Sequence, residues 1–300
     1  MKIFRHYRDV TDAYKGAVVA VGNFDGVHLG HQALIGTARR IAEERGAPLG
    51  VLAFEPHPQE FFRPSPVSFR LTPFRAKARL IAGLGVDVLY ALAFDAEMAA
   101  KPAQDFVMDV LVDGLAVSAV VVGRDFQFGK GRAGTTTTLA DMGKEERFGV
   151  TLFDPVLAHG DDKISSTEIR DALKTGRPEV AARLLGHPWA VEGRVEHGDK
   201  RGRTIGFPTA NMRLVDCLQP AFGIYAVRAK IFENDQVIET HEGVASFGIR
   251  PMFEMPVPML ETYLFDFDGD LYGRHMSVEF VAYLRAEAKY DDLETLKVQI

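Results

Sequence analysis

Short apolar runs alternate with helical patterns through residues 17–186, and this alternation limits the fold more than any other feature of the chain. A continuous run such as AVVAVGNF is typical of a strand buried on both faces of a sheet. The helical pattern that follows places Leu34, Ala38 and Ala42 on one stripe, and Gly46 ends it. We therefore predict a parallel sheet with crossover helices. The predicted strands are 17–24, 49–56, 86–94 and 116–123, and the predicted helices are 31–45, 71–85, 101–115 and 164–186.

The pattern changes near residue 188, after which the apolar runs are strand-like and separated by turn residues such as Asn-Asp and DGD. One closing helical segment, DDLETLKVQI, ends the sequence. Several short strands of this kind favour a small antiparallel barrel. We therefore predict two domains, residues 1–186 and residues 187–300.

Composition excludes several classes of protein. The chain has 300 residues, of which 47% are hydrophobic and 25% charged, as in an ordinary globular protein. No apolar run could span a bilayer, and the first residues lack the apolar core of a signal peptide, so we expect a cytoplasmic protein without a membrane partner. The single Cys217 excludes an internal disulfide, and its surroundings predict an inert thiol. The net charge of −6 argues against nucleic acid as a partner, so local groups must hold any anionic ligand.

Two histidines, His28 and His31, stand in VGNFDGVHLGH, where the first strand gives way to a helix. They could be metal ligands, but a zinc site needs further ligands that this motif lacks. A histidine that only caps the helix is the ordinary alternative. The glycines around them permit close backbone approach, and the helix directs its positive end at the loop. We therefore predict that the two imidazoles and the backbone N–H groups bind a phosphate.

Three other segments of the first half have a functional and an ordinary interpretation. EPHPQEFF offers His57 and an aromatic face, although an aromatic pair after a strand usually belongs to a core. VGRDFQFGKGRAG is either a solvated loop or a phosphate- or flavin-binding loop that carries Arg124 and stacking rings. ISSTEIR is a capped helix start whose hydroxyls, with Arg170 one turn in, also suit the leaving phosphates of ATP.

The second half contains oxygen ligands and one carboxylate of interest. Thr209 and Asn211, in PTAN, are of the kind that hold Mg²⁺ beside a nucleotide. Glu261 lies in an apolar strand, LETYLF, where it is either solvated or a placed general base. No Walker loop occurs in the chain.

Taken together, nine motifs in order resemble the prokaryotic bifunctional riboflavin kinase/FMN adenylyltransferase (FAD synthetase) family. They are GNFDGVHLGH, EPHP, VGRDFQFGKGRAG, ISSTEIR, GRVEHGDKRGRTIGFPTANM, GIYAV, GVASFGIRPMF, ETYLFDFDGDLYG and VEFVAYLR. The resemblance implies an α/β nucleotidyltransferase domain with a Rossmann-like parallel sheet, followed by a small antiparallel β-barrel riboflavin kinase domain. It also implies two reactions with ATP: riboflavin to FMN, and FMN to FAD with release of pyrophosphate. Riboflavin, FMN, FAD and ATP are then substrates or products, and Mg²⁺ accompanies ATP.

The resemblance also implies roles for individual residues. His28, His31 and Glu261 would be catalytic. ATP in the adenylyltransferase would be bound by Gly22, Phe24, Asp25, His28, His31, Ser165, Thr167 and Arg170. The flavin there would be bound by His57, Phe62, Asp125 and Phe128. ATP and Mg²⁺ in the kinase would be bound by Gly198, Gly206, Pro208, Thr209 and Asn211, with Thr209 and Asn211 as the metal ligands.

The sequence departs from the family pattern at Ser246 and Met252, where Asn and Thr are expected. Two rival functions remain: another adenylyltransferase with the same histidine motif, and a flavin-binding regulatory protein without turnover. The first leaves the PTAN-bearing barrel unexplained. The second leaves the intact set of candidate catalytic residues unexplained.

Overall fold

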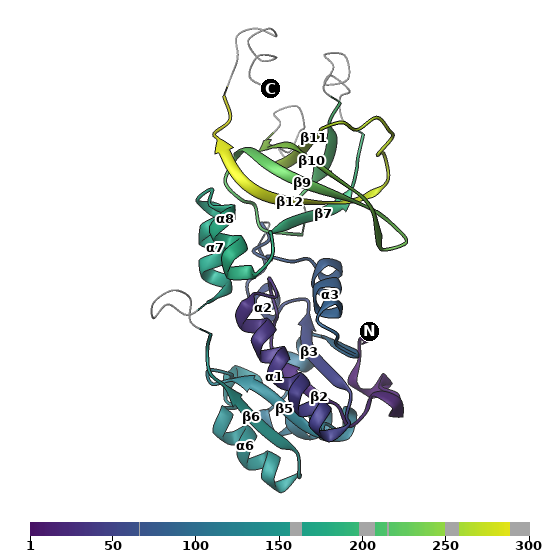
Figure 1. Cartoon of the computed structure of the whole chain (residues 1–300). Helices are drawn as coiled ribbons and strands as arrows, with labels where there is room; N and C mark the ends of the chain where they lie inside the picture. Colours follow the sequence, from purple (N-terminus) through teal and green to yellow (C-terminus); the bar gives the residue numbers. More distant parts are fainter. Residues whose placement is uncertain (66, 157–163, 198–207, 215, 250–257, 289–300) are drawn as a thin grey trace. The chain divides into compact units, whose positions relative to one another are not determined.

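The computed structural model describes residues 1–65, 67–156, 164–197, 208–214, 216–249 and 258–288. The chain forms two units, one of residues 1–66 and 72–166 and one of residues 67–71 and 167–300. Each unit is built on one six-stranded sheet (Figure 1).

The sheet of the first unit is parallel, as the alternation of strands and helices predicts. Its strand order is β1-β4-β3-β2-β5-β6. The four predicted strands are β2 to β5, and two edge strands, β1 and β6, extend the sheet. The strands are β1 (Lys2–Phe4), β2 (Val18–Val21), β3 (Leu49–Glu55), β4 (Val88–Ala93), β5 (Ala119–Gly123) and β6 (Gly149–Phe153).

Helices cover both faces of this sheet. Val18 and Ala20 of β2 pack in one core with α1 and α3, whereas Val19 and Val21 pack in a second core with η3 and α6. This division follows from the strand period of two, which sends successive side chains to opposite faces. The helices are α1 (Leu29–Arg45), α2 (Pro58–Phe62), α3 (Phe74–Gly83), α4 (Ala96–Ala100), α5 (Ala103–Asp105), η3 (Phe106–Gly114) and α6 (Thr136–Glu145), with 3₁₀ turns at η1 (Tyr7–Asp9), η2 (Asp12–Tyr14) and η4 (Lys130–Arg132).

Two predicted helices differ in detail. The segment 101–115 is mainly a π-helix, η3, in which bonds such as that from the Leu115 N–H to the Val110 carbonyl (2.9 Å) span five residues. The segment 71–85 begins its helix only at Phe74, and Thr72, although Thr is a common helix cap, does not cap it. Thr72 instead bonds to a distant loop, as described below.

The chain order of the strands marks one edge of the first sheet as a ligand site. From β2 the chain adds β3 and β4 on one side and later adds β5 and β6 on the other. The order therefore reverses between β2 and β5, and ligands of open α/β sheets bind beyond the carboxyl ends of the strands at such a point. The loops after β2, β3 and β5 all leave from this edge.

The sheet of the second unit is antiparallel, with the order β7-β12-β9-β10-β11-β8. An isolated bridge between Glu196 and Asn211 joins the chain after β7 to β8, so the sheet nearly closes into the predicted barrel. Helices α7 and α8 precede it. The elements are α7 (Ser166–Lys174), α8 (Pro178–Leu185), β7 (Ala190–Arg194), β8 (Ala210–Arg213), β9 (Gly223–Glu233), β10 (Gln236–Ile249), β11 (Pro258–Leu264) and β12 (His275–Arg285).

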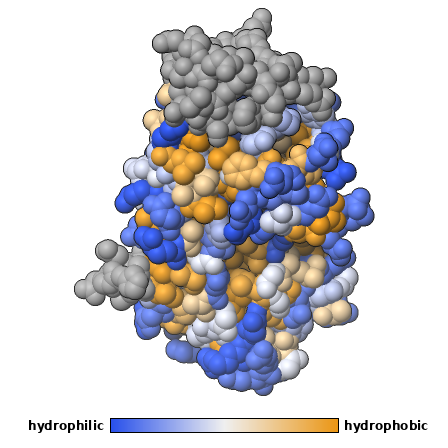
Figure 2. Space-filling model, turned by 45° about the horizontal axis from the view of Figure 1, so that its top comes forward, coloured by the Kyte–Doolittle hydropathy of each residue, from blue (hydrophilic) through white to orange (hydrophobic). Residues whose placement is uncertain are grey.

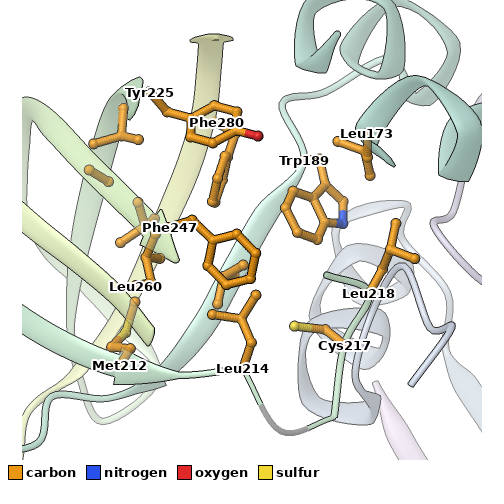
Figure 3. Close-up of a cluster of buried hydrophobic side chains, with 14 of the residues drawn as sticks. Leu173, Trp189, Met212, Leu214, Cys217, Leu218, Tyr225, Phe247, Leu260 and Phe280 are labelled. Carbon is orange, nitrogen blue, oxygen red and sulfur yellow. The ribbon is translucent and has the colours of Figure 1, made fainter. Parts of the chain in front are cut away.

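Trp189 is the largest fully buried side chain in the described part of the second unit's core. Leu173 of α7 lies on one side of its ring and Phe280 of β12 on the other (Figure 3). The indole N–H donates to the Leu71 carbonyl at 2.8 Å, and Leu71 is itself fully buried in this core. The short segment 67–71, which the sequence places between β3 and α3, therefore belongs to the packing of the second unit.

On the face shown in Figure 2, apolar residues are interspersed with hydrophilic ones. Among the large apolar side chains of the described residues, Phe62 stands out because 62% of it is exposed. The predicted closing helix at 291–300 and the residues Gly198, Gly206 and Met252 lie outside the described residues.

Candidate active sites

The loop from β2 to α1 has a strained backbone. Phe24, Gly26 and Val27 have φ angles of 51°, 85° and 45°, in the left-handed region. A β-branched residue such as Val27 adopts this conformation only where the surrounding structure enforces it. Such strain is concentrated at functional sites, and here it occurs beyond the carboxyl end of β2.

Hydrogen bonds from distant residues enforce this loop conformation. The Asp25 carboxylate accepts from the Thr72 N–H at 3.1 Å, and the Gly26 N–H donates to the Thr72 hydroxyl at 3.0 Å. Ser166 adds a bond from its hydroxyl to the Asp25 carbonyl at 2.9 Å. Asp25 and Thr72 are both buried, so these bonds form away from competing water. Asp25 therefore shapes the loop.

His28 is the N-cap of α1, and its Nδ1 accepts the N–H of His31 at 3.3 Å. The capping interpretation is therefore correct for this residue, and it leaves Nε2 as the protonated nitrogen of the neutral ring. A Cβ at the intervening Gly30 would crowd the His28 ring, at a distance of 3.2 Å. Capping and ligand binding do not exclude one another, because the cap uses one ring nitrogen.

The ring of His31 stacks on that of His28, with 3.6 Å between centroids and 17° between planes, and also contacts Phe24 at 5.1 Å. Its Nδ1 is buried and has no hydrogen-bond partner among the described residues. Burial, His28 and Lys77 lower the pKa of His31 well below 6.5, so its ring is neutral near pH 7. A buried nitrogen without a hydrogen-bond partner is rare in proteins, and this one lies at the start of a 17-residue helix, where a ligand could bond to it.

These features together have the chemistry that anion binding requires. The first N–H groups of α1 and the positive end of its dipole meet the two imidazoles at the switch point of the sheet. A phosphate bound there would supply acceptors for the donors and would favour protonation of His31. The arrangement of this loop is therefore compatible with the binding of nucleotide phosphates.

The segment EPHPQEFF lies at the carboxyl end of β3. His57 is buried and caps α2, with Nδ1 accepting from the Gln59 N–H at 3.1 Å. Phe62 ends α2 and packs edge-to-face against Phe61 and Phe94 while most of its ring stays exposed. An exposed, supported aromatic ring is a surface on which a flat ligand can stack.

The loop after β5 divides its residues between surface and core. Arg124 is exposed and forms a bidentate ion pair with Asp154, which raises the pKa of Arg124. Asp125 is also exposed, whereas Phe128 is buried and packs against Phe106 and Phe126. Phe128 thus anchors the loop and does not present its ring at the surface.

The helix of ISSTEIR is α7, which begins at Ser166. Ser165 belongs to the first unit, and Thr167 and Arg170 belong to the second. Arg170 is half-buried, donates from Nε to the Phe69 carbonyl at 2.8 Å, and lies over the Phe69 ring. The helix start is therefore tied to the segment 67–71.

A second polar group lies across strands of the second unit. Asn211 on β8 pairs with Glu261 on β11, which pairs with Ser246 on β10. Their neighbours along the strands, such as Met212 and Leu260, face the buried core, so these three polar side chains lie on the opposite face. Directly opposite residues have Cβ atoms about 4.5–5.5 Å apart, so the register places an amide, a carboxylate and a hydroxyl within reach of one ligand.

The residues beside Glu261 fit a Mg²⁺–nucleotide. Asn211 is buried, and its Nδ2 donates to the Thr209 carbonyl at 3.3 Å, which leaves Oδ1 as the ligand atom of the amide. Thr209 is half-buried and follows the exposed Pro208. The described residues contain no group of three His, Cys, Asp or Glu side chains that could cage a metal. Mg²⁺ commonly binds through one or two protein oxygens and substrate phosphates, so this sparse donor set is compatible with it.

Comparison with known proteins identifies the two units. Residues 10–168 match the family model described as FAD synthetase, and residues 185–300 match the one described as riboflavin kinase. An Escherichia coli protein named bifunctional riboflavin kinase/FMN adenylyltransferase is 41% identical, over 100% of this chain and 95% of its own. A protein of the same name from Bacillus subtilis is 41% identical, over 95% of this chain and 89% of its own. The chain belongs to the bifunctional riboflavin kinase/FMN adenylyltransferase family.

Membership of this family confirms the predicted fold class and the predicted pair of activities: the chain is an enzyme of flavin cofactor synthesis. A crystal structure titled as a macrolide-efflux protein from Streptococcus pneumoniae has the same fold, with a TM-score of 0.85 and 32% identity over 99% of this chain and 95% of that one. In the described part of this chain, no helix has the length and apolar character needed to cross a membrane.

Two further residues of the first site were missed in the sequence. Thr72 stands before Pro73 and an apolar helix, which is the usual pattern of a helix cap, and no neighbouring residue in the sequence indicates its bond to Asp25. Lys77 is buried beside Glu55, and it occupies a core position of the stripe formed by Phe74, Ala78 and Ile81. The position of a charged residue on an apolar helical stripe was the sequence signal that could have identified Lys77. Cys217 is buried, which raises its pKa to about 12 and agrees with an inert thiol.

Proposed function

We propose that the two polar sites divide the two reactions, with the Glu261 row phosphorylating riboflavin and the His28–His31 loop transferring the adenylyl group. The observation that carries this proposal is that each family match contains its own preorganised polar site, one on a loop and one on strands. Incubation with riboflavin, ATP and Mg²⁺, followed by chromatographic separation of flavins, tests it. FMN and then FAD should accumulate, and an absence of both would contradict it.

In the kinase reaction, the oxygen of the ribityl 5′-hydroxyl attacks the γ-phosphorus of ATP, and Glu261 accepts the proton of that hydroxyl. The new O–P bond replaces the bond to the bridging oxygen, and ADP leaves with the electron pair. The position of Glu261 opposite Asn211 supports this assignment, because the base then lies beside the residues that hold the nucleotide. Phosphoryl transfer depends mainly on positioning and charge stabilisation, which a rigid sheet supplies.

Mg²⁺ would be held by Thr209 and Asn211 with the ATP phosphates, and it would supply charge neutralisation there. Gly198, Gly206 and Pro208 complete the proposed nucleotide-binding set, of which the two glycines lie outside the described residues.

In the adenylyl transfer, a phosphate oxygen of FMN attacks the α-phosphorus of ATP, and pyrophosphate leaves as the bond to the bridging oxygen breaks. The FMN phosphate is largely ionised near pH 7, so this step needs no strong base. His28 and His31 stabilise the charge that develops on the phosphate oxygens. Gly22, Phe24 and Asp25 shape the loop, and Ser165, Thr167 and Arg170 bind the departing phosphates.

The flavin of the adenylyl transfer would lie against the exposed ring of Phe62. His57 and Asp125 lie in the loops after β3 and β5, which flank the strand that carries the phosphate loop. Phe128 would contribute by anchoring the second of these loops through its packing against Phe106. A flavin absorbance shift on binding FMN, lost in Phe62→Ala, tests this placement.

We also propose functional domains at residues 1–186 and 187–300. Ile169, Leu173 and Leu185 of α7 and α8 share the core of Trp189, so they stabilise the second unit. Burial of each contributes about 1.5–3 kcal/mol, so a fragment 164–300 should unfold at higher urea than a fragment 187–300. Riboflavin phosphorylation by both fragments would support the boundary, and activity of the longer one alone would move it before α7.

A cytoplasmic location remains a prediction, in keeping with two reactions that both consume ATP. Cell fractionation followed by activity measurement tests it.

A further inference from the structure

Lys77 is a buried cation that the mechanism above does not use. It lies on α3, and only 3% of its side chain is exposed. An ammonium group in such a place costs several kcal/mol unless it is paired and hydrogen-bonded. The residues that pair with Lys77 therefore indicate its role in the structure.

The Lys77 ammonium joins two segments that meet at the ligand edge of the first sheet. Its Nζ lies 3.3 Å from Oε2 of Glu55 and 3.4 Å from the carbonyl oxygen of Asn23. Asn23 stands two residues after β2, at the start of the phosphate loop, and Glu55 ends β3 two residues before His57. One ammonium thus fixes the spacing between the phosphate loop and the segment that begins α2.

Helix α3 holds the phosphate loop at two points. Thr72, just before the helix, bonds to Asp25 and Gly26, and Lys77, one turn into it, bonds to Asn23. The strained φ angle of Phe24 lies within residues 23–26, which these contacts hold, and the strained φ angle of Val27 follows directly after them. The helix therefore maintains a loop conformation that the backbone alone would not keep.

Lys77 also affects His31 electrostatically. Burial of the His31 ring lowers its pKa. The neighbouring imidazole of His28 and the Lys77 ammonium lower it further. In the free protein these groups keep the ring neutral. The negative charge of a bound polyphosphate would raise the pKa of His31 and favour its protonated ring.

We propose that Lys77 is a positioning residue for adenylyl transfer, holding Asn23 and Glu55 together so that His28 and His31 face the ATP phosphates. The proposal rests on the adenylyl transfer assigned to this loop. Lys77 acts through the loop and through His31. Its effect should therefore appear in turnover and in the titration of His31.

The test compares Lys77→Met, Lys77→Arg and the double variant Lys77→Met/Glu55→Gln, which removes both charges at once. With FMN and ATP as substrates, we expect Lys77→Met and the double variant to lose about 10²-fold in kcat, the scale of a misplaced group, with a smaller change in KM. The pKa of His31, followed by NMR, should rise in Lys77→Met and stay low in Lys77→Arg.

Lys101→Met is the matched control. Lys101 is a largely buried lysine of the same unit, with 10% of its side chain exposed, and its ion pair with Asp109 lies outside the loop from β2 to α1. This variant should keep the adenylyl transfer rate and the His31 titration of the unsubstituted protein. Riboflavin phosphorylation should be unchanged in every variant.

Two results would overturn the inference. One is a folded double variant with normal kcat and an unchanged His31 titration. The other is loss of the folded first unit in both Met-containing variants, which would assign the ion pair to stability alone. If the unsubstituted protein makes no FAD from FMN in the same assay, the proposed function itself fails. Normal FAD synthesis by both the protein and Lys77→Met would refute only the role of Lys77.

Discussion

The phosphate loop of the first unit and the polar row of the second unit hold their functional side chains in different ways. His28 and His31 lie on a strained loop and a helix start, which residues from elsewhere in the unit keep in place. Asn211 and Glu261 lie on neighbouring strands, where the ladder register alone sets them opposite one another. A strand site needs no strain, because the alternation of side chains already directs it to one face.

Because of this difference, we expect substitutions to impair the two sites in different ways. The loop site depends on a few buried contacts, so changes well away from the histidines should disturb it. The strand site depends on register, so single side-chain changes there should remove chemistry and leave the barrel intact.

Glu261→Gln should give the largest effect. Glutamine keeps the size and the hydrogen bonding of the side chain but cannot accept the proton of the ribityl hydroxyl. We expect riboflavin phosphorylation to fall about 10²–10⁴-fold in single-turnover measurements, with ATP binding little changed. Adenylylation of added FMN should continue. Glu242→Gln, an exposed change on the neighbouring β10, is the control, and near-normal phosphorylation by Glu261→Gln would refute the base.

His31→Ala should give the reverse pattern. It removes a ring placed to stabilise charge in the transition state, so FAD formation from FMN and ATP should fall about 10²–10³-fold, as on loss of an oxyanion donor. Riboflavin phosphorylation should persist, because Glu261 and Asn211 are untouched. His6→Ala, at the start of η1 in the same unit, is the control. Bound transition metal in the unsubstituted protein, together with surviving FAD synthesis in His31→Ala, would favour a metal site instead.

The loop site should also make the stability of the protein depend on pH through His31, an effect smaller than the two losses of activity. The lowered pKa of His31 means that the unfolded chain binds a proton below about pH 6.5 that the folded protein rejects. Stability is therefore fully present above that pH and falls as the pH decreases towards the lowered pKa, by up to about 1.4 kcal/mol per pH unit. Urea unfolding at several pH values should show this slope, and His31→Gln should reduce it. An identical slope in both proteins would contradict a neutral, buried His31.

Much of the fold was predictable because hydrophobic periodicity is a local signal. The apolar runs 17–24 and 116–123 became adjacent parallel strands, and α1 ended at Gly46 with φ of 61°. The strand β8 was missed, because its sequence, ANMR, is short and contains none of the β-branched or aromatic residues that are enriched in strands. The π-helix η3 was predicted as an ordinary helix, since periodicity does not distinguish the two over nine residues.

The candidate sites were predictable only where a motif is continuous in the sequence. HLGH placed both histidines at one helix start, and the structure adds that one caps the helix while the other has a buried, unpaired nitrogen. The contacts of Thr72 and Lys77 with that loop join residues about 50 positions apart, as the separation of 46 between Gly26 and Thr72 illustrates. The roles of the site residues in binding and catalysis remain predictions.

The sequence by itself determined the two fold classes and the short motifs, because period, glycine position and helix ends depend on neighbours along the chain. Tertiary structure alone decided that the segment 67–71 packs with Trp189, that Glu261 stands opposite Asn211, and that Lys77 bonds to Asn23. These outcomes depend on strand register and on burial between distant segments. Both are set by the packing of the whole core, in which each buried polar group must find a partner wherever the fold brings one.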